Sequence, residues 1–83
     1  MNGPESIDWN RIIGKEARSK DDEDYGEVKE VREGHVITER GIIEKDKFVI
    51  PKNKVYGFDG HTLWLDIPGE TRAEFLQPKE HTS

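Results

Sequence analysis

The densest group of ionisable side chains is an acidic run, Asp-Asp-Glu-Asp, at residues 21–24. Clustered carboxylates are ligands that calcium prefers in proteins. Aligning the run with a calcium-binding loop from Asp21 places Gly26 correctly, at the sharp turn of that loop. Tyr25 and Arg32 then fall where the loop needs oxygen ligands, so the pattern fails. The run predicts a solvated acidic turn rather than a cation site.

The other candidate metal ligands are His35, His61 and His81. Their spacing matches no zinc-binding motif, and the chain has no cysteine that could complete a site. The absence of cysteine also excludes disulfides. We therefore predict no metal site and no cofactor.

A nucleophile needs a neighbouring base and a position that exposes it. Ser6 and Ser83 lie near the chain ends, and Ser19 lies in a polar turn. No carboxylate is marked as a general acid or base, because such a role needs burial or a charged partner. Gly57 and Gly60 flank a hairpin turn and do not form a phosphate-binding loop. The sequence predicts a protein that is not an enzyme, with no catalytic residue.

Composition limits the class of protein further. The chain has 83 residues, enough for one small domain, and 37% of them are charged. The net charge of −5 argues against direct nucleic-acid binding, which needs a basic face. No apolar run approaches the length of a membrane span or a signal-peptide core, so we expect no membrane insertion and a cytoplasmic location.

Short runs of β-branched and aromatic residues, separated by turn signals, predict strands along most of the chain. The expected fold is all-β, a small six-stranded antiparallel barrel followed by a short helical turn at residues 71–76. Residues 7–76 would form the domain, with flexible tails at residues 1–6 and 77–83. The expected strands lie at residues 14–18, 25–31, 35–38, 48–51 and on both sides of Asp59-Gly60, and Ile42-Ile43 could begin a further run.

Asp59-Gly60 is the clearest hairpin signal, because both residues tolerate a positive φ. A two-residue turn there would place Val55 opposite Trp64 and Tyr56 opposite Leu63. Trp64 and Val55 would then share one face of the hairpin, while Tyr56 would share the other with its leucines.

The order of these segments resembles the PRC-barrel family. The likeness rests on IGKEA at residues 13–17, YGEVKEV at 25–31, FVIP at 48–51 and YGFDGHTLWL at 56–65. It covers residues 12–67, although residues 33–47 have little family character. The family is named for a domain of the photosynthetic reaction centre H subunit, and it includes a domain of a ribosome-maturation factor. The resemblance implies a PRC-type six-stranded barrel that acts as a noncatalytic adaptor for other proteins.

We therefore expect an unidentified protein partner, bound through Trp64, Val55, Tyr56 and Trp9, because aromatic side chains are enriched at binding hot spots. The alternative is that the segment at residues 9–13, or Phe75 and Leu76, covers Trp64 as part of the core. A homodimer could also bury this face. Two other functions stay open: a ribosome- or RNA-processing-associated factor, and a barrel that binds a small molecule or metal.

Overall fold

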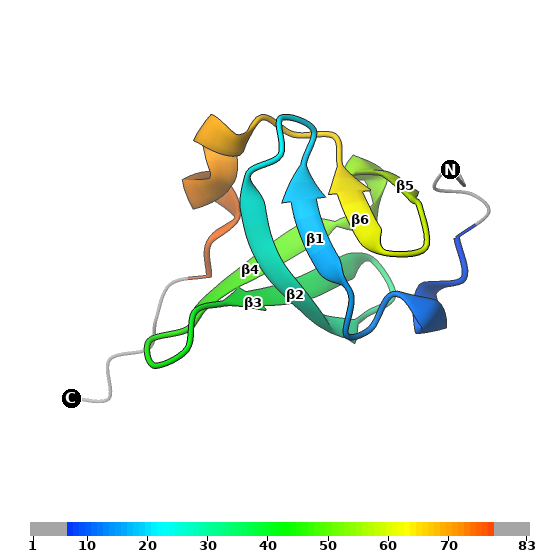
Figure 1. The fold of residues 1–83 in the computed structure, drawn as a ribbon, viewed down its shortest axis with the longest axis horizontal. Helices are drawn as coiled ribbons and strands as arrows, with labels where there is room; N and C mark the ends of the chain where they lie inside the picture. The colour runs from blue at the N-terminus through cyan, green and yellow to red at the C-terminus, as the bar shows by residue number, and fades with distance from the viewer. Residues whose placement is uncertain (1–6, 78–83) are drawn as a thin grey trace.

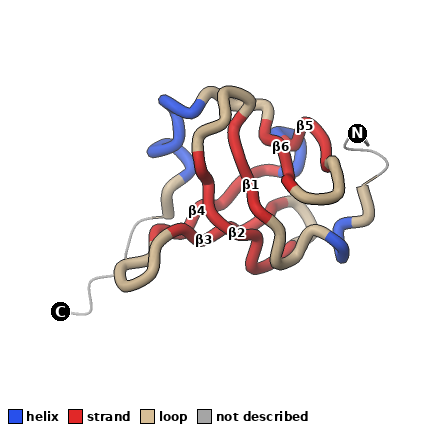
Figure 2. Tube along the Cα trace, viewed as in Figure 1, coloured by secondary structure: helices blue, strands red, loops and turns tan. Residues whose placement is uncertain are grey.

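The structure is a computed structural model and describes residues 7–77. The expectations placed on residues 1–6 and 78–83, including Ser6, His81 and Ser83, lie outside this range. Short 3-10 helices connect the strands (Figures 1 and 2). In chain order the elements are η2 (Trp9–Arg11), β1 (Glu16–Ser19), β2 (Asp24–Val31), β3 (His35–Arg40), β4 (Asp46–Pro51), η3 (Lys52–Lys54), β5 (Val55–Phe58), β6 (Thr62–Leu65) and η4 (Gly69–Phe75).

All six strands belong to one sheet with the order β4-β3-β2-β1-β6-β5. Neighbouring strands are antiparallel except for β1 and β6, which run parallel. The prediction of a mainly β fold with six strands and a C-terminal helical turn is therefore confirmed.

The sheet is strongly curled. Its two edge strands, β4 and β5, are joined by η3 alone. Four residues span at most about 14 Å of chain. In a flat sheet, five strand spacings would place the edges about 24 Å apart. The sheet must therefore bend around its core, and in Figure 1 β3 and β4 run across the direction of β1 and β6.

The expected closed, purely antiparallel barrel is wrong in both respects. No ladder joins β4 to β5 among the described residues, so the sheet stays open. Pro51 ends β4 and has no N–H to extend a ladder. The chain then passes through η3 without a hairpin turn, so it does not reverse direction. As a result, β4 and β5 both run opposite to β1. The reversal between β5 and β6 consequently makes β6 parallel to β1.

The core lies inside this curl and draws one or more side chains from every strand. Its fully buried members include Tyr25 and Val28 of β2, Ile50 of β4 and Leu63 and Leu65 of β6. Ile12, after η2, is also fully buried in this core. The core is thin, as expected for a chain of this size.

Gly26 produces an irregularity in β2. The register between β1 and β2 shifts there, so Tyr25 has no direct partner on β1. Gly26 has φ +89°, and a Cβ atom at this position would lie 2.1 Å from the backbone oxygen of Glu39. Only glycine combines this conformation with so close an approach of β3.

The pairing predicted for the last hairpin is wrong by two positions. The structure pairs Phe58 with Leu63 and Gly57 with Trp64. Asp59 N donates to Thr62 O at 3.3 Å, so Gly60 and His61 form the tip of the turn. A further register shift at Tyr56 then pairs Val55 with Leu65.

The C-terminal segment is fixed from two sides. At the start of η4, Gly69 N donates to Asp21 Oδ1 at 2.8 Å. Beyond its end, Leu76 forms an antiparallel bridge with Phe48, and Gln77 N donates to Lys47 O at 2.7 Å. The segment therefore covers part of the outer edge of β4.

Candidate interaction surfaces

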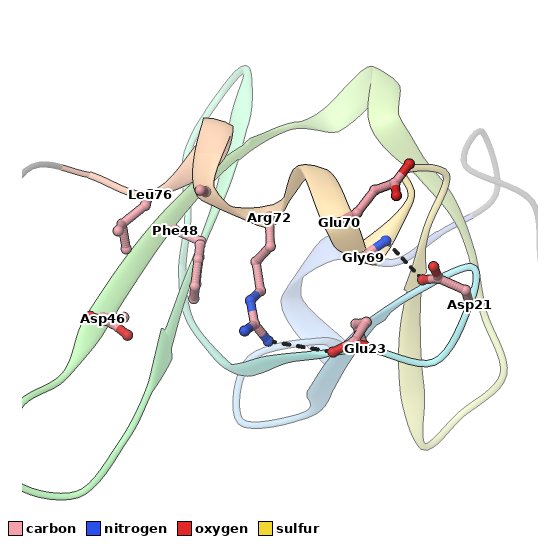
Figure 3. A pocket seen from close by; sticks show the side chains of 9 residues that line it. Asp21, Glu23, Asp46, Phe48, Gly69, Glu70, Arg72 and Leu76 are labelled. Carbon is pink, nitrogen blue, oxygen red and sulfur yellow. Dashed lines mark hydrogen bonds and ion pairs between the residues drawn. The ribbon is translucent and has the colours of Figure 1, made fainter.

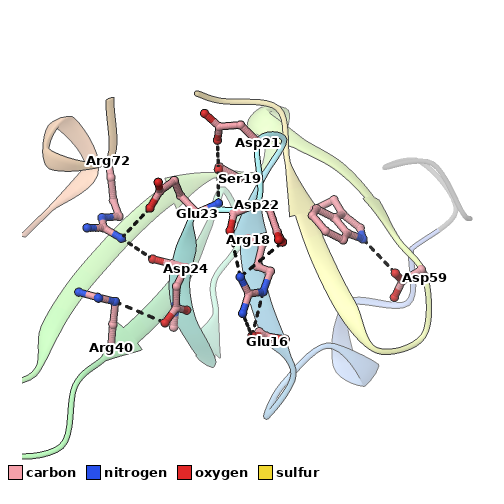
Figure 4. A network of polar contacts seen from close by, with 12 residues as sticks. Glu16, Arg18, Ser19, Asp21, Asp22, Glu23, Asp24, Arg40, Asp59 and Arg72 are labelled. Carbon is pink, nitrogen blue, oxygen red and sulfur yellow. Dashed lines mark hydrogen bonds and ion pairs between the residues drawn. The ribbon is translucent and has the colours of Figure 1, made fainter. Parts of the chain in front are cut away.

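Trp64 lies on the outer face of β6. Its neighbours Leu63 and Leu65 are fully buried, so alternation along the strand directs the indole away from the core. The indole Nε1 donates to Asp59 Oδ2 at 2.9 Å (Figure 4). Trp64 is therefore a half-buried surface residue held in place by the turn.

Asp59 organises that turn. Its Oδ1 accepts hydrogen bonds from His61 N at 2.9 Å and Thr62 N at 2.7 Å. The bond from Trp64, followed by these two backbone bonds, lowers the pKa of Asp59 to about 2. Three donors on one carboxylate favour its charged form.

The other three residues of the predicted contact surface lie in different environments. Val55 is 2% exposed and belongs to the core, because the register shift at Tyr56 turns it inward. Tyr56 is 53% exposed. Trp9 packs against the core, and its outer side lies under Lys52, whose Nζ is 4.6 Å from the ring centre. Tyr56 and part of Trp64 thus face solvent, but Val55 does not.

Among residues 7–77, the most exposed large apolar side chains are Ile42 and Ile43, at 92% and 93%. They lie in the connection between β3 and β4, residues 41–45, which we call the isoleucine loop. In Figure 1 this loop extends away from the body of the sheet. Its base is strongly charged: Lys45 and Lys47 each lie 3.8 Å from a carboxylate oxygen of Glu39. Two adjacent isoleucines therefore project from a charged base.

A groove of about 520 Å³ lies between η4, the start of β4 and the acidic turn (Figure 3). We call it the η4 groove. Phe48, Ala73 and Leu76 provide its apolar lining. Its acidic lining consists of Asp21, Glu23, Asp46 and Glu70, and its only cation among the described residues is Arg72.

The acidic turn has a structural role that a solvated turn would lack. Asp21 accepts hydrogen bonds from the Ser19 hydroxyl and from Gly69 N, and these bonds lower its pKa. A Cβ atom on Gly69 would lie 1.9 Å from Cγ of Glu23, so the turn and η4 are in close contact. The run at residues 21–24 thus anchors η4 to the sheet.

Arg72 connects the groove to the strands. Its Nη1 donates to Asp24 O at 2.8 Å and lies 3.8 Å from Glu23 Oε2. The Asp24 carboxylate in turn lies 3.4 Å from Nε of Arg40, at the end of β3 (Figure 4). A continuous set of polar contacts therefore runs from the groove to the base of the isoleucine loop.

Tyr25 is fully buried next to this groove. Its ring packs against Phe48, with the centroids 5.2 Å apart. Its hydroxyl has no hydrogen-bond partner among the described residues. The Thr71 hydroxyl donates to Pro68 O at 2.8 Å. Burial raises the pKa of Tyr25.

The structure gives no support to a metal site formed by residues 7–77. No group of three potential ligand side chains comes together in this part of the chain. His35 is at the start of β3 and His61 at the tip of the last hairpin, and both are exposed.

Ser19, one of the candidate nucleophiles, is buried and bonds to the acidic turn.

Within residues 7–77, no helix is long and apolar enough to cross a membrane.

Sequence reasoning missed the isoleucine loop and the groove. By residue type Ile42-Ile43 could begin a strand, because β-branched residues favour one. The available signal was their position between Arg40-Gly41 and a run of alternating charges at residues 44–47, which is typical of a loop tip. The groove had no local signal, since its walls come from three segments that lie more than 20 positions apart in sequence.

No known protein family's model matches the chain, and no curated protein matches it.

Proposed function

We propose that this protein is a noncatalytic adaptor domain that binds another protein through the isoleucine loop. The observation that carries the proposal is the near-complete exposure of Ile42 and Ile43, side by side at the tip of a projecting connection. In a domain with so thin a core, two large apolar side chains left outside contribute nothing to folding. Burying each against a partner would contribute about 1.5–3 kcal/mol.

The surroundings of the loop fit a contact surface. An apolar centre within a polar margin is the usual arrangement of protein interfaces. Glu39, Lys45 and Lys47 supply such a margin at the base of the loop. Tyr56 and the exposed part of Trp64 are a second, smaller aromatic surface on the β5–β6 hairpin, and we keep them in the proposal as additional contacts. Val55 is excluded because it is buried.

We further propose that the chain is a relative of the PRC-barrel family and acts in the cytoplasm. The segments that carry the resemblance correspond to β1, β2, β4 and the β5–β6 hairpin. The curled six-stranded sheet supports this relationship, while its open edge sets it apart from a closed barrel. An adaptor role agrees with what the resemblance implies.

Affinity capture tests the proposal directly. The chain would be immobilised as wild type, as Ile42→Ser/Ile43→Ser and as Ile13→Ser, and proteins retained from a lysate of the source organism would be quantified. Ile13 is a matched control because it is a 50% exposed isoleucine elsewhere on the surface. We expect a partner retained by wild type and Ile13→Ser and lost from the double variant. Equal retention by all three proteins would contradict the proposal.

A further inference from the structure

The strand that follows the isoleucine loop lies at an edge of the sheet. β4 has β3 on one side only, and the loop at residues 41–45 leads directly into its first residue. The outer side of an edge strand presents backbone N–H and C=O groups with which another extended segment can pair. A partner segment on the isoleucine loop is therefore next to an open side of the sheet.

A short C-terminal segment, Leu76 and Gln77, already occupies part of this edge, and we call it the strap. Leu76 forms an antiparallel bridge with Phe48 (Figure 3). Gln77 N donates to Lys47 O at 2.7 Å. In an antiparallel ladder the N–H and C=O of one residue point to the same side, so Lys47 and Val49 direct theirs outward. The strap thus shows what the edge accepts: an extended segment, antiparallel to β4, with an apolar side chain opposite Phe48.

The strap is held less firmly than the rest of η4. It contributes a single backbone hydrogen bond to β4 within residues 7–77, and Leu76 stays 38% exposed. The other anchors lie earlier in η4. Gly69 N donates to Asp21 at its start, and Arg72 in its middle donates to Asp24 O. The body of η4 can therefore keep its place when the strap leaves β4.

The rest of the sheet directs an added strand to this place. The opposite edge strand, β5, has only four residues and a register shift at Tyr56, and both features disfavour further pairing. Pro51 ends β4 on the side away from the isoleucine loop and has no N–H for a ladder. The half of β4 next to the loop is the part suited to pairing.

From these contacts we propose that the protein bound at the isoleucine loop displaces the strap and adds a strand of its own to the outer edge of β4. This inference rests on the function proposed above and adds the form of the partner: an extended segment with an apolar residue in the place of Leu76. Such strand addition is a known mode of peptide recognition.

The direction of the pairing connects the two contacts. A strand that follows the strap passes Phe48 and then Lys47, and so runs toward the loop. The last loop residue, Lys45, lies two positions further on, about 7 Å along a strand. One continuous segment can therefore pair with β4 and cover Ile42 and Ile43. Because the strap competes for the same edge, it lowers the apparent affinity of the chain for its partner.

A disulfide that locks the strap provides the matched control. The bridge places Gln77 opposite Lys47, and both side chains are exposed. Opposite residues that exchange backbone bonds have Cα atoms about 5.5 Å apart, a separation that a disulfide spans. The chain has no cysteine, so Lys47→Cys/Gln77→Cys forms one defined bond when oxidised. Its reduced form has the same residues and a free strap.

A peptide titration tests the edge without the natural partner. The probe is an acetylated and amidated decapeptide in which valine alternates with threonine between terminal lysines. Its counterpart has proline in place of each threonine and cannot form a ladder. The full chain, labelled with ¹⁵N, is titrated by NMR as wild type, as both forms of the double cysteine variant, as Gln77→Pro and as Gln77→Ala.

Gln77→Pro removes the N–H that binds Lys47, and Gln77→Ala keeps it. Leu76 already has an extended backbone, with φ −70° and ψ 125°, so it accepts a proline after it. A melting temperature close to that of the wild type shows that each variant is folded.

We expect the valine–threonine peptide to shift the amides of Lys47, Phe48, Val49 and Gln77, and the proline peptide to leave them unchanged. The Kd should fall about threefold in Gln77→Pro, because the edge is free more often, and stay within about 1.5-fold in Gln77→Ala. The oxidised double variant should not bind the peptide, whereas its reduced form should. In affinity capture, the protein whose retention depends on Ile42 and Ile43 should be retained by the reduced form and lost from the oxidised one.

Four outcomes would overturn the inference. They are no saturable binding of the valine–threonine peptide to wild type or Gln77→Pro, shifts that map to β5, equal peptide binding by the oxidised and reduced forms, and equal capture of the partner by both forms. If the lock has no effect while capture still depends on Ile42 and Ile43, the strand addition is wrong and the adaptor function stands. Loss of the dependence on Ile42 and Ile43 would remove the adaptor function itself.

Discussion

The indole N–H of Trp64 donates to Asp59 Oδ2 at 2.9 Å, across the turn that joins β5 to β6. The same carboxylate accepts from two backbone amides of the turn. One aspartate thus fixes both the path of the hairpin and the orientation of the tryptophan on its outer face. Trp64 is held by the turn, whereas the partly buried side chains that pack against the core are Trp9, Val31 and Phe75.

Trp64→Phe should raise the pKa of Asp59 above its value of about 2, because the bond from the indole is the largest cause of the depression. The ring remains, so the hairpin stays folded through the two backbone bonds. Titration of the Asp59 carboxyl carbon by NMR measures the change. An unaltered pKa in Trp64→Phe would show that the indole does not stabilise the charged form.

The same interaction predicts a dependence of stability on pH. The pKa of Asp59 is lower in the folded state than its usual value of 3.8, so its contribution is present above that value and lost as the pH falls toward about 2. Solvent screens this exposed group, and we expect a contribution under about 1 kcal/mol. The difference in unfolding free energy between wild type and Trp64→Phe should shrink from pH 5 toward about pH 2. A constant difference in unfolding free energy across that pH range would show that the bond from Trp64 to the charged Asp59 does not stabilise the fold.

Val55→Ala should destabilise the fold, and Tyr56→Ala should not, although the two residues are adjacent. Val55 is buried against the core, and its truncation should cost about 2 kcal/mol. Tyr56 is turned outward by the register shift, so its loss should change stability by at most about 0.5 kcal/mol. Urea unfolding of both variants makes the comparison, and equal costs would mean that the shift at Tyr56 is absent.

Gly26→Ala should cost about 3 kcal/mol, because the new Cβ would meet the Glu39 backbone and the residue would keep a positive φ. Gly34→Ala is the matched control: nothing lies within 4 Å of its Cβ position, and its φ is not positive. Thermal unfolding should therefore separate the two variants clearly. Similar melting temperatures of Gly26→Ala and Gly34→Ala would show that the irregularity in β2 does not lie at Gly26.

Tyr25→Phe should leave the free chain as stable as wild type or stabilise it by about 1 kcal/mol. The substitution keeps the ring contact with Phe48 and removes a buried hydroxyl that has no partner. Urea unfolding measures the difference. A loss of more than about 1 kcal/mol would show that the hydroxyl is hydrogen-bonded in solution.

Local patterns predicted most of the strands. Runs rich in Val, Ile and aromatic residues became strands, and Gly26, with its positive φ, marks the irregularity in β2. The register of the last hairpin could not be predicted, because Gly60 can serve either of two adjacent turns. The choice depends on the side chain of Asp59, which accepts from His61 N and Thr62 N and so places the turn one residue later.

Long-range relationships had no signal in the sequence. The parallel pairing of β1 with β6 depends on the path of the chain through η3. The η4 groove depends on the contact between Asp21 and Gly69, 48 residues apart. Ile42 and Ile43 fit a strand by residue type, and only the extent of β3 and β4 leaves them in a loop.

The most direct test of the adaptor function is photo-crosslinking in cells of the source organism, with benzoylphenylalanine in place of Ile42 or, as the control, Ile13. We expect a discrete crosslinked product with one other protein from position 42 and none from position 13. Products that are equal at both positions, absent at position 42, or of twice the 9.6 kDa mass of the chain alone would contradict it.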